Sequence, residues 1–289
     1  MNFICSGQNQ VIKEIKALKE KKYRDQKGLY FIEGIRFIEE ALKENVEITK
    51  IIVSDKLEEV NGGKELLEQL ENANFYNVPP FSNEVKEAES SGAKHPRDFV
   101  YTVPNKLYME LTDTENPQGI LAVLRKKQIN IEEVYDKKNF FVVLDSIQDP
   151  GNMGTIIRTA DAAGATGVVV SKGCVDVYNP KVLRSTMGSL FHVPICYGEN
   201  ILETLQSMKD KGIRLCAAHL SGNRNYFELG YKDNIAIIIG NEANGISDNI
   251  AAISNELVKI PMAGKSESLN ASVAAGLLMY EVLRLQLKK

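Results

Sequence analysis

The sequence predicts an α/β fold whose second half holds a parallel sheet covered by helices on both faces. Apolar runs recur there without the alternation of a half-exposed strand, and segments with helical periodicity separate them. The expected strands are FFVVL at 140–144, GVVV at 167–170, VPICY at 193–197, IRLCAA at 213–218 and NIAIIIG at 234–240. The expected helices are 153–163, 180–187, 201–211 and 269–287.

The first half predicts a smaller α/β domain. Apolar residues from Val11 to Leu18 recur at helical spacing and predict an amphipathic first helix. Strand and helix patterns follow, with strands expected at 29–33, 48–53, 74–78 and 120–124 and helices at 35–45, 64–73 and 83–90. A polar stretch then resembles a linker, so the expected organisation is a domain at 1–126, a linker at 127–139 and a domain at 140–289.

The composition is that of a folded protein, with 289 residues of which 44% are hydrophobic and 25% are charged. No apolar run reaches the length of about 18 residues that a transmembrane helix needs. The N-terminal residues lack the apolar core of a signal peptide. Four cysteines form no Cys-x-x-Cys pair, and three histidines lack metal-ligand spacing. We therefore expect a cytoplasmic protein with reduced cysteines, no metal and no membrane partner.

The charge is distributed unevenly along the chain. The net charge of −3 argues against nucleic-acid binding by the whole surface. Residues 1–27, however, carry seven basic and three acidic side chains, a local net charge of +4. This basic face is either a solvated helix surface or a contact for RNA phosphates. Its candidate contact residues are Lys13, Lys16, Lys19, Lys21, Lys22 and Arg24.

The common nucleotide-binding and hydrolase signatures are absent. The GKS at 264–266 resembles the end of a P-loop, but Lys259 stands where that loop needs glycine. No G-x-G-x-x-G follows a strand, and no G-x-S-x-G occurs. The sequence therefore favours neither a dinucleotide-binding enzyme nor a serine hydrolase.

Residues 145–165 form the first of three polar constellations in the second half. The segment runs from a strand through a tight turn at Pro150 into a helix, and Asn152 stands at the expected N-cap position. Arg158 lies opposite the apolar stripe of this helix. It either pairs with Asp161, three residues later, or faces a ligand.

Two further constellations follow. At 237–247 an apolar strand ends in glycine at Gly240, and glycine at the carboxyl end of a buried strand lets a ligand approach the backbone. The alternative is a plain turn with Glu242 in solvent. At 260–276, Ser268 and Asn270 open a helix rich in small residues. Ser268 is expected to cap that helix, with or without a functional contact.

Together the three constellations resemble the motifs of the SpoU (TrmH) family of RNA 2′-O-ribose methyltransferases, which are of the SPOUT class. The matching patterns are D-x-x-x-D-P-x-N-x-G-x-x-x-R-x-A from Asp145, G-N-E-x-x-G from Gly240 and I-P-M-x-G-x-x-x-S-L-N-x-S from Ile260. They occur in the family's order and cover most of 140–287. The first half, with KGLYFIEGIRFIEEAL and NPQGILAV, is similar to the family's smaller RNA-binding domain.

The resemblance implies a deep trefoil knot in the second domain that binds S-adenosylmethionine, largely through backbone groups. It also implies a homodimer in which Arg158 works near the partner's cofactor. By motif position the expected catalytic residues are Arg158, Asn152, Glu242, Ser268 and Asn270, and the expected cofactor-binding residues are Gly240, Ile260, Leu269, Leu220, Ser221 and Met262.

The substrate that the resemblance implies is RNA, with ribosomal RNA favoured over transfer RNA because a separate first domain is present. Two alternatives belong to other functional classes. One is a cofactor- and RNA-binding protein without catalysis, and the other is a small-molecule α/β transferase.

Overall fold

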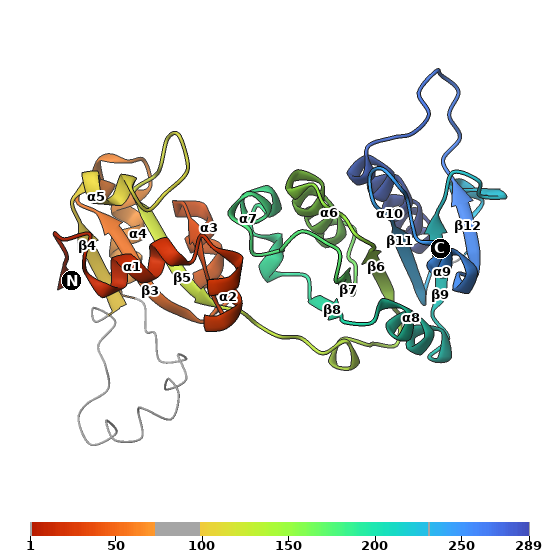
Figure 1. Cartoon of the computed structure of the whole chain (residues 1–289), viewed down its shortest axis with the longest axis horizontal. Coiled ribbons are helices and arrows are strands. Elements are labelled where there is room, and N and C mark those ends of the chain that lie inside the picture. Colours follow the sequence, from red (N-terminus) through yellow and green to blue (C-terminus); the bar gives the residue numbers. More distant parts are fainter. Residues whose placement is uncertain (1, 73–98, 231, 289) are drawn as a thin grey trace. The chain divides into compact units, whose positions relative to one another are not determined.

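The computed structural model describes residues 2–72, 99–230 and 232–288 (Figure 1). The chain divides into two compact units, Met1–Lys127 and Gln128–Lys289, and each is described by itself. The strand expected at 74–78 and the helix expected at 83–90 lie outside the described residues. No helix in the described ranges is long and apolar enough to cross a membrane.

The first unit is built on a five-stranded sheet in the order β1-β4-β3-β5-β2. Strand β5 is antiparallel to its neighbours β3 and β2, whereas β1, β4 and β3 are parallel. The elements are β1 (Asn2–Phe3), α1 (Gln10–Ala17), α2 (Lys21–Lys27), β2 (Leu29–Glu33), α3 (Ile35–Lys43), β3 (Ile48–Ser54), η1 (Leu57–Glu59), α4 (Gly63–Asn72), β4 (Val100–Val103), α5 (Asn105–Met109) and β5 (Ile120–Arg125).

Helix α1 is amphipathic, as predicted, and its apolar face packs into the core of the first unit. Ile12, Ile15 and Leu18 are fully buried there. The side chain of Asn9 caps the helix by accepting a hydrogen bond of 2.8 Å from the backbone N–H of Val11.

The basic face expected over α1 and α2 is only partly present. Arg24 is buried, and its Nη1 donates to the backbone oxygens of Leu18 (2.8 Å) and Lys19 (2.7 Å), which satisfies carbonyls at the end of α1. Lys16 and Lys19 form ion pairs of 2.7 Å with Glu110 and Asp113. The expectation that Arg24 faces outward is therefore wrong. The candidate contact residues that are exposed and without an ion pair among the described residues are Lys13, Lys21 and Lys22.

The second unit is built on a seven-stranded, all-parallel sheet in the order β10-β12-β9-β11-β6-β7-β8. Its elements are η3 (Ile131–Glu133), β6 (Phe140–Leu144), α6 (Pro150–Ala162), β7 (Gly167–Ser171), α7 (Pro180–Thr186), η4 (Ser189–Phe191), β8 (Ile195–Gly198), α8 (Ile201–Asp210), β9 (Arg214–Ala218), β10 (Arg224–Asn225), η5 (Tyr226–Glu228), β11 (Ile235–Ile239), α9 (Asp248–Ile253), β12 (Glu256–Lys259) and α10 (Ala271–Leu287).

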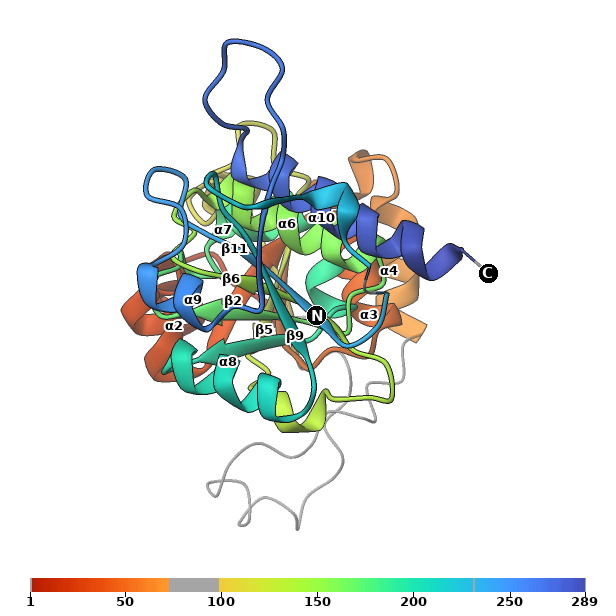
Figure 2. The same cartoon turned by 90° about the vertical axis from the view of Figure 1, so that its right-hand side faces the viewer.

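Helices cover both faces of this sheet, which confirms the predicted α/β class. Helices α6, α7 and α10 share one core cluster with alternate residues of β6, β7 and β11, such as Val142 and Ile237. Helices α8 and α9 share a second cluster with the opposite residues, such as Val143 and Ile238. Figure 2 shows α6 and α10 on one side of the sheet and α8 on the other. Both faces are buried, which explains the lack of alternation in the strand sequences.

Residues 128–139, expected within a linker, lie against the second unit. Ile129 forms a bridge with Cys196 of β8. Ile131, Val134 and Tyr135 pack on the cluster beneath α8 and α9. Apolar residues in this polar stretch therefore cover part of the sheet.

Candidate functional site

Three segments meet at the carboxyl edge of the second unit's sheet. Strands β6 and β11 are parallel neighbours, so the segment 145–149 after β6 lies beside the segment 240–247 after β11. The third segment, 260–270, leads from β12 into α10, which packs against α6 and β11. The carboxyl edge of a parallel sheet is where ligands bind in α/β folds.

Helix α6 begins three residues earlier than the sequence suggested. Its N-cap is Asp149, whose Oδ1 accepts a hydrogen bond of 2.7 Å from the backbone N–H of Asn152, and Pro150 occupies the first turn. The prediction that Asn152 is the N-cap is therefore wrong. Asn152 lies inside the first turn with only 7% of its surface exposed, and its side chain is available to the site.

A chain of hydrogen bonds joins the three segments through their side chains. Asn270 donates from Nδ2 to Oδ1 of Asn152 (2.9 Å), and Asn152 donates from Nδ2 to Oε1 of Glu242 (2.9 Å). The Glu242 carboxylate also accepts from the backbone N–H groups of Gln148 (3.3 Å) and Asp149 (3.2 Å). The amide of Asn152 is thus held by an acceptor on one side and a donor on the other, which fixes its orientation.

These contacts change the acidity of Glu242. Burial alone raises the pKa of its carboxyl, but hydrogen bonds from the Asn152 side chain and from backbone N–H groups outweigh that effect and lower the pKa below its ordinary value. Glu242 is therefore ionised at neutral pH and acts as an acceptor, not as an acid. Glu242 is exposed to solvent, as the alternative of a plain turn expected, but its carboxylate is also held by Asn152 and two backbone N–H groups.

The loop after β11 is folded so tightly that residue 240 must be glycine. A Cβ on Gly240 would lie 2.2 Å from backbone atoms of Gly245 and Ile246. Asn241 fastens this loop to the loop after β6 by donating from Nδ2 to the backbone oxygen of Ser146 (2.8 Å). The backbone groups near Gly240 are therefore held in place for a ligand.

Asp145 and Asn241 are two positions that our prediction of site residues missed. Asp145 is buried, and its Oδ2 accepts a hydrogen bond of 3.1 Å from the backbone N–H of Ser247. Both residues follow buried strands directly, and a polar residue at such a place was the available signal.

Helix α10 is capped by Asn270 and not by Ser268. Oδ1 of Asn270 accepts from the backbone N–H groups of Ser272 (2.9 Å) and Val273 (3.3 Å). The prediction that Ser268 caps the helix is therefore wrong. Ser268 is exposed on the loop before the cap.

The six residues expected to bind the cofactor lie on segments that follow β9, β11 and β12, which are neighbours in the sheet. Leu220 is 72% exposed and Leu269 is 36% exposed. Ile260 and Met262 are half-buried, and Ser221 is exposed. Exposed apolar side chains beside glycine backbone fit a purine nucleoside, which needs both an apolar surface and backbone hydrogen bonds.

Arg158 lies on the exposed face of α6 and forms no ion pair among the residues the structure describes. Asp161, the partner that sequence spacing offered, instead lies 2.9 Å from Nδ1 of His192. The alternative of an Arg158–Asp161 pair is therefore wrong. The Arg158 guanidinium keeps its donors for a ligand.

Comparison with known proteins gives matches for both halves of the chain. Residues 139–280 match the model of the SpoU rRNA Methylase family, and residues 9–122 match an MRM3-like substrate binding domain. A 23S rRNA (guanosine(2553)-2′-O)-methyltransferase, RlmP of Bacillus subtilis, is 31% identical over 98% of this chain and 99% of its own length.

Two solved structures are also similar over almost the whole chain. An S-adenosylmethionine-bound rRNA methyltransferase from Sinorhizobium meliloti has a TM-score of 0.81 and 27% identity, covering 100% of this chain and 99% of its own. The SpoU methyltransferase AviRb from Streptomyces viridochromogenes, also with S-adenosylmethionine, has a TM-score of 0.78 and 26% identity, covering 97% and 99%.

Proposed function

Because the chain belongs to the SpoU rRNA methylase family, we propose that its substrate is a ribose of ribosomal RNA. The chain is an RNA ribose 2′-O-methyltransferase that uses S-adenosylmethionine. The observation that carries this conclusion is the convergence of the three segments through Asn152, Glu242 and Asn270. The ribosomal target is supported by the 23S rRNA methyltransferase that is similar over 98% of this chain. Ribosomal RNA as substrate also favours a cytoplasmic location.

We propose that backbone groups near Gly240, Ile260 and Leu269 bind the adenosine of S-adenosylmethionine. Leu220, Ser221 and Met262 would complete that surface. When bound, the cofactor supplies an electrophilic methyl group. The tight loop supports this assignment, because the close packing of Gly240 against the backbone of Gly245 and Ile246 holds the loop's backbone groups in place for a nucleoside.

The proposed role of Arg158 is to orient the ribose hydroxyl and its neighbouring phosphate by bidentate hydrogen bonds. A guanidinium offers hydrogen-bond donors and no acceptor, which suits orientation of the hydroxyl and not removal of its proton. Asn152 keeps one amide N–H beyond its bond to Glu242 and can donate it to the substrate. Glu242 and Asn270 then act as positioning residues that set the direction of the Asn152 amide. Ser268 would line the same pocket.

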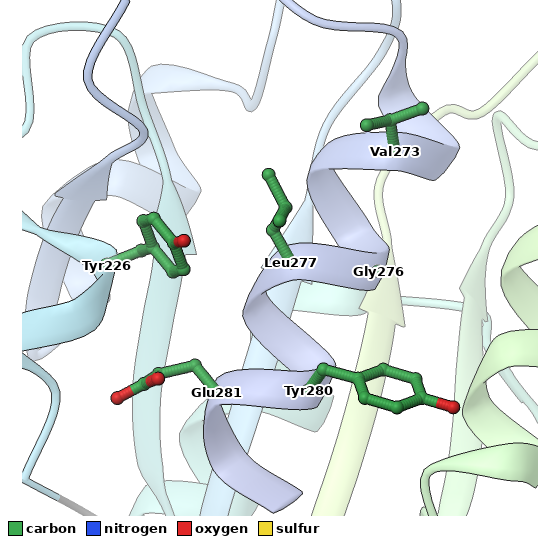
Figure 3. Close-up of a pocket in the computed structure, with 6 residues that line it drawn as sticks. All are labelled: Tyr226, Val273, Gly276, Leu277, Tyr280 and Glu281. Carbon is green, nitrogen blue, oxygen red and sulfur yellow. The ribbon is translucent and has the colours of Figure 1, made fainter. Parts of the chain in front are cut away.

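A second copy of the chain is the proposed occupant of an apolar groove on α10. The groove has a volume of about 450 Å³ and is lined by Tyr226, Val273, Gly276, Leu277, Tyr280 and Glu281 (Figure 3). Val273 and Tyr280 are 51% and 50% exposed, although α10 already buries its opposite face in the core. A helix that is apolar on two faces is typical of an interface. Sedimentation of an active protein as a monomer at micromolar concentration would contradict the homodimer.

The proposed trefoil knot is supported by the course of the chain after β12. Strand β12 lies beyond β9, whereas α10 returns to α6 and β11. The segment 260–270 therefore recrosses the edge that carries the loops after β9 and β11. The loop after β9 packs tightly on β12, since a Cβ on Gly222 would lie 2.6 Å from the backbone carbon of Val258.

Methyl mapping of RNA from a strain lacking this protein tests the proposed function. One ribose of ribosomal RNA should lose its methyl group in that strain and regain it when the protein is restored. Restoration of an Arg158→Ala variant should not bring the methyl group back. Unchanged ribosomal RNA methylation in the deletion strain would refute the proposed substrate.

A further inference from the structure

The second unit has five arginines, which divide into two groups according to their surroundings. Three of them form ion pairs with glutamates, and these are Arg214, Arg224 and Arg284. The other two, Arg158 and Arg184, are exposed and have no ion-pair partner within the described ranges. An unpaired guanidinium keeps all five of its N–H donors for a ligand.

Arg158 and Arg184 lie on two helices that pack directly on each other, α6 and α7 (Figure 1). A Cβ on Gly154 of α6 would lie 2.3 Å from Cβ of Ser185 and 2.7 Å from the backbone oxygen of Val182. A second contact, between Asp161 and His192, joins residues that are also 31 positions apart. The two segments therefore run side by side in the same direction.

The cations of this helix pair fall on one strip. Lys181 and Arg184 are both exposed and three residues apart, so they share a face of α7. Arg158 follows Gly154 by one helical turn and therefore lies toward α7. The single acid within the two helices is Asp161, whose carboxylate already faces His192. Lys181, Arg184 and Arg158 together form a cationic strip.

We infer that Lys181 and Arg184 bind backbone phosphates of the RNA next to the nucleotide that is methylated. This inference rests on the proposed function, which places Arg158 at the ribose. Because α6 and α7 pack together within one chain, a strand whose ribose meets Arg158 passes over α7. Its phosphates there meet Lys181 and Arg184, two cations that form no ion pair with an acid in the described part of the chain. In a chain of net charge −3, such unpaired clusters are the places where a polyanion binds.

The test uses the full chain and 23S ribosomal RNA transcribed in vitro. We compare the wild type with Lys181→Gln/Arg184→Gln and with Arg214→Gln, a control that removes an exposed but ion-paired arginine. The double variant should raise the KM for RNA on the order of tenfold and lower the slope of log affinity against log salt by about 2, one unit for each lost phosphate contact. Its kcat at saturating RNA and its affinity for S-adenosylmethionine should stay within about twofold.

The outcomes separate the inference from the proposed function. An Arg184→Lys variant should keep most of the salt slope, since the charge remains. If the wild type methylates the RNA and the double variant has the same KM and salt slope, Lys181 and Arg184 do not bind RNA phosphates. That result would overturn the inference and leave the proposed function unaffected. A wild type that binds S-adenosylmethionine but neither binds nor methylates ribosomal RNA would refute the proposed function, and the strip with it.

Discussion

Replacing Glu242 by glutamine tests the hydrogen-bonded centre of the site with the smallest change of shape. The carboxylate accepts hydrogen bonds from the Asn152 side chain and from the backbone N–H groups of Gln148 and Asp149. Glutamine offers one oxygen in place of two and no charge. At least one of the three donors then faces an NH₂ group and loses its partner.

The expected loss of stability is modest because the Glu242 side chain is exposed to solvent. A hydrogen bond to a charged group contributes about 1.5–3 kcal/mol where it is buried, and solvent screening reduces this to about 1 kcal/mol here. For a unit of this size, 1 kcal/mol corresponds to a fall in Tm of about 2–4 °C. The effect on activity should be larger than the effect on stability. The kcat should fall by about tenfold or more, since the Asn152 amide can then rotate.

The stability difference between wild type and Glu242→Gln should depend on pH. The pKa of Glu242 is lowered in the folded protein, so its carboxylate stabilises the fold fully above the pKa of the unfolded chain. That contribution is lost as the pH falls through the folded-state pKa. The difference should therefore be full at pH 7 and begin to shrink below about pH 4.3, the ordinary pKa of glutamate.

Differential scanning calorimetry at a series of pH values measures this difference. Glu199→Gln is the matched control, since Glu199 is an exposed glutamate for which the described residues provide no hydrogen-bond partner. A Glu242→Gln variant with wild-type Tm and kcat at pH 7 would refute the positioning role. A difference in Tm that stays constant down to pH 3.5 would show that the charge of Glu242 contributes nothing.

Three further predictions concern the cations. Arg158→Ala should abolish methyl transfer while calorimetry finds the S-adenosylmethionine affinity nearly intact, and equal loss of both would refute its assignment to the ribose. His192→Ala should lower kcat, because Asp161 is then free to pair with Arg158. Adding Asp161→Asn should restore kcat, and a double variant as slow as His192→Ala would contradict this explanation. Reversing the charges of Lys13, Lys21 and Lys22, the unpaired cations of the basic face over α1 and α2, should weaken RNA binding and flatten its salt dependence more than Lys16→Gln/Lys19→Gln does. Equal effects in a filter-binding assay would exclude that surface.

Strands β6, β7 and β11 of the second unit were predictable because each is buried on both faces and therefore apolar throughout. The expected run at 140–144 is β6, and the run at 234–240 contains β11. Helix starts were less predictable. Asn152 and Asp149 are both good N-caps, and only the turn geometry at Pro150 decides between them.

The contacts that set the available charge were not predictable, because they join residues far apart in the sequence. Lys16 and Glu110 are separated by 94 residues, and nothing in the local pattern of α1 indicates that pair. Arg24 reads as a surface cation beside four lysines, yet it is buried on the carbonyls that end α1. The Asp161–His192 pair is a third such contact. Sequence spacing offered Asp161 as a partner for Arg158, and the local pattern does not show that His192 takes that place.

The most direct test of the central claim is the position of the transferred methyl group. Purified protein is incubated with radiolabelled S-adenosylmethionine and unmodified 23S ribosomal RNA, and the RNA is then hydrolysed with alkali. Alkaline cleavage needs a free 2′-hydroxyl, so ribose methylation predicts that the label is recovered in an alkali-resistant dinucleotide. An Arg158→Ala control should give no label. Label in mononucleotides would indicate methylation of a base, and that result would contradict the account.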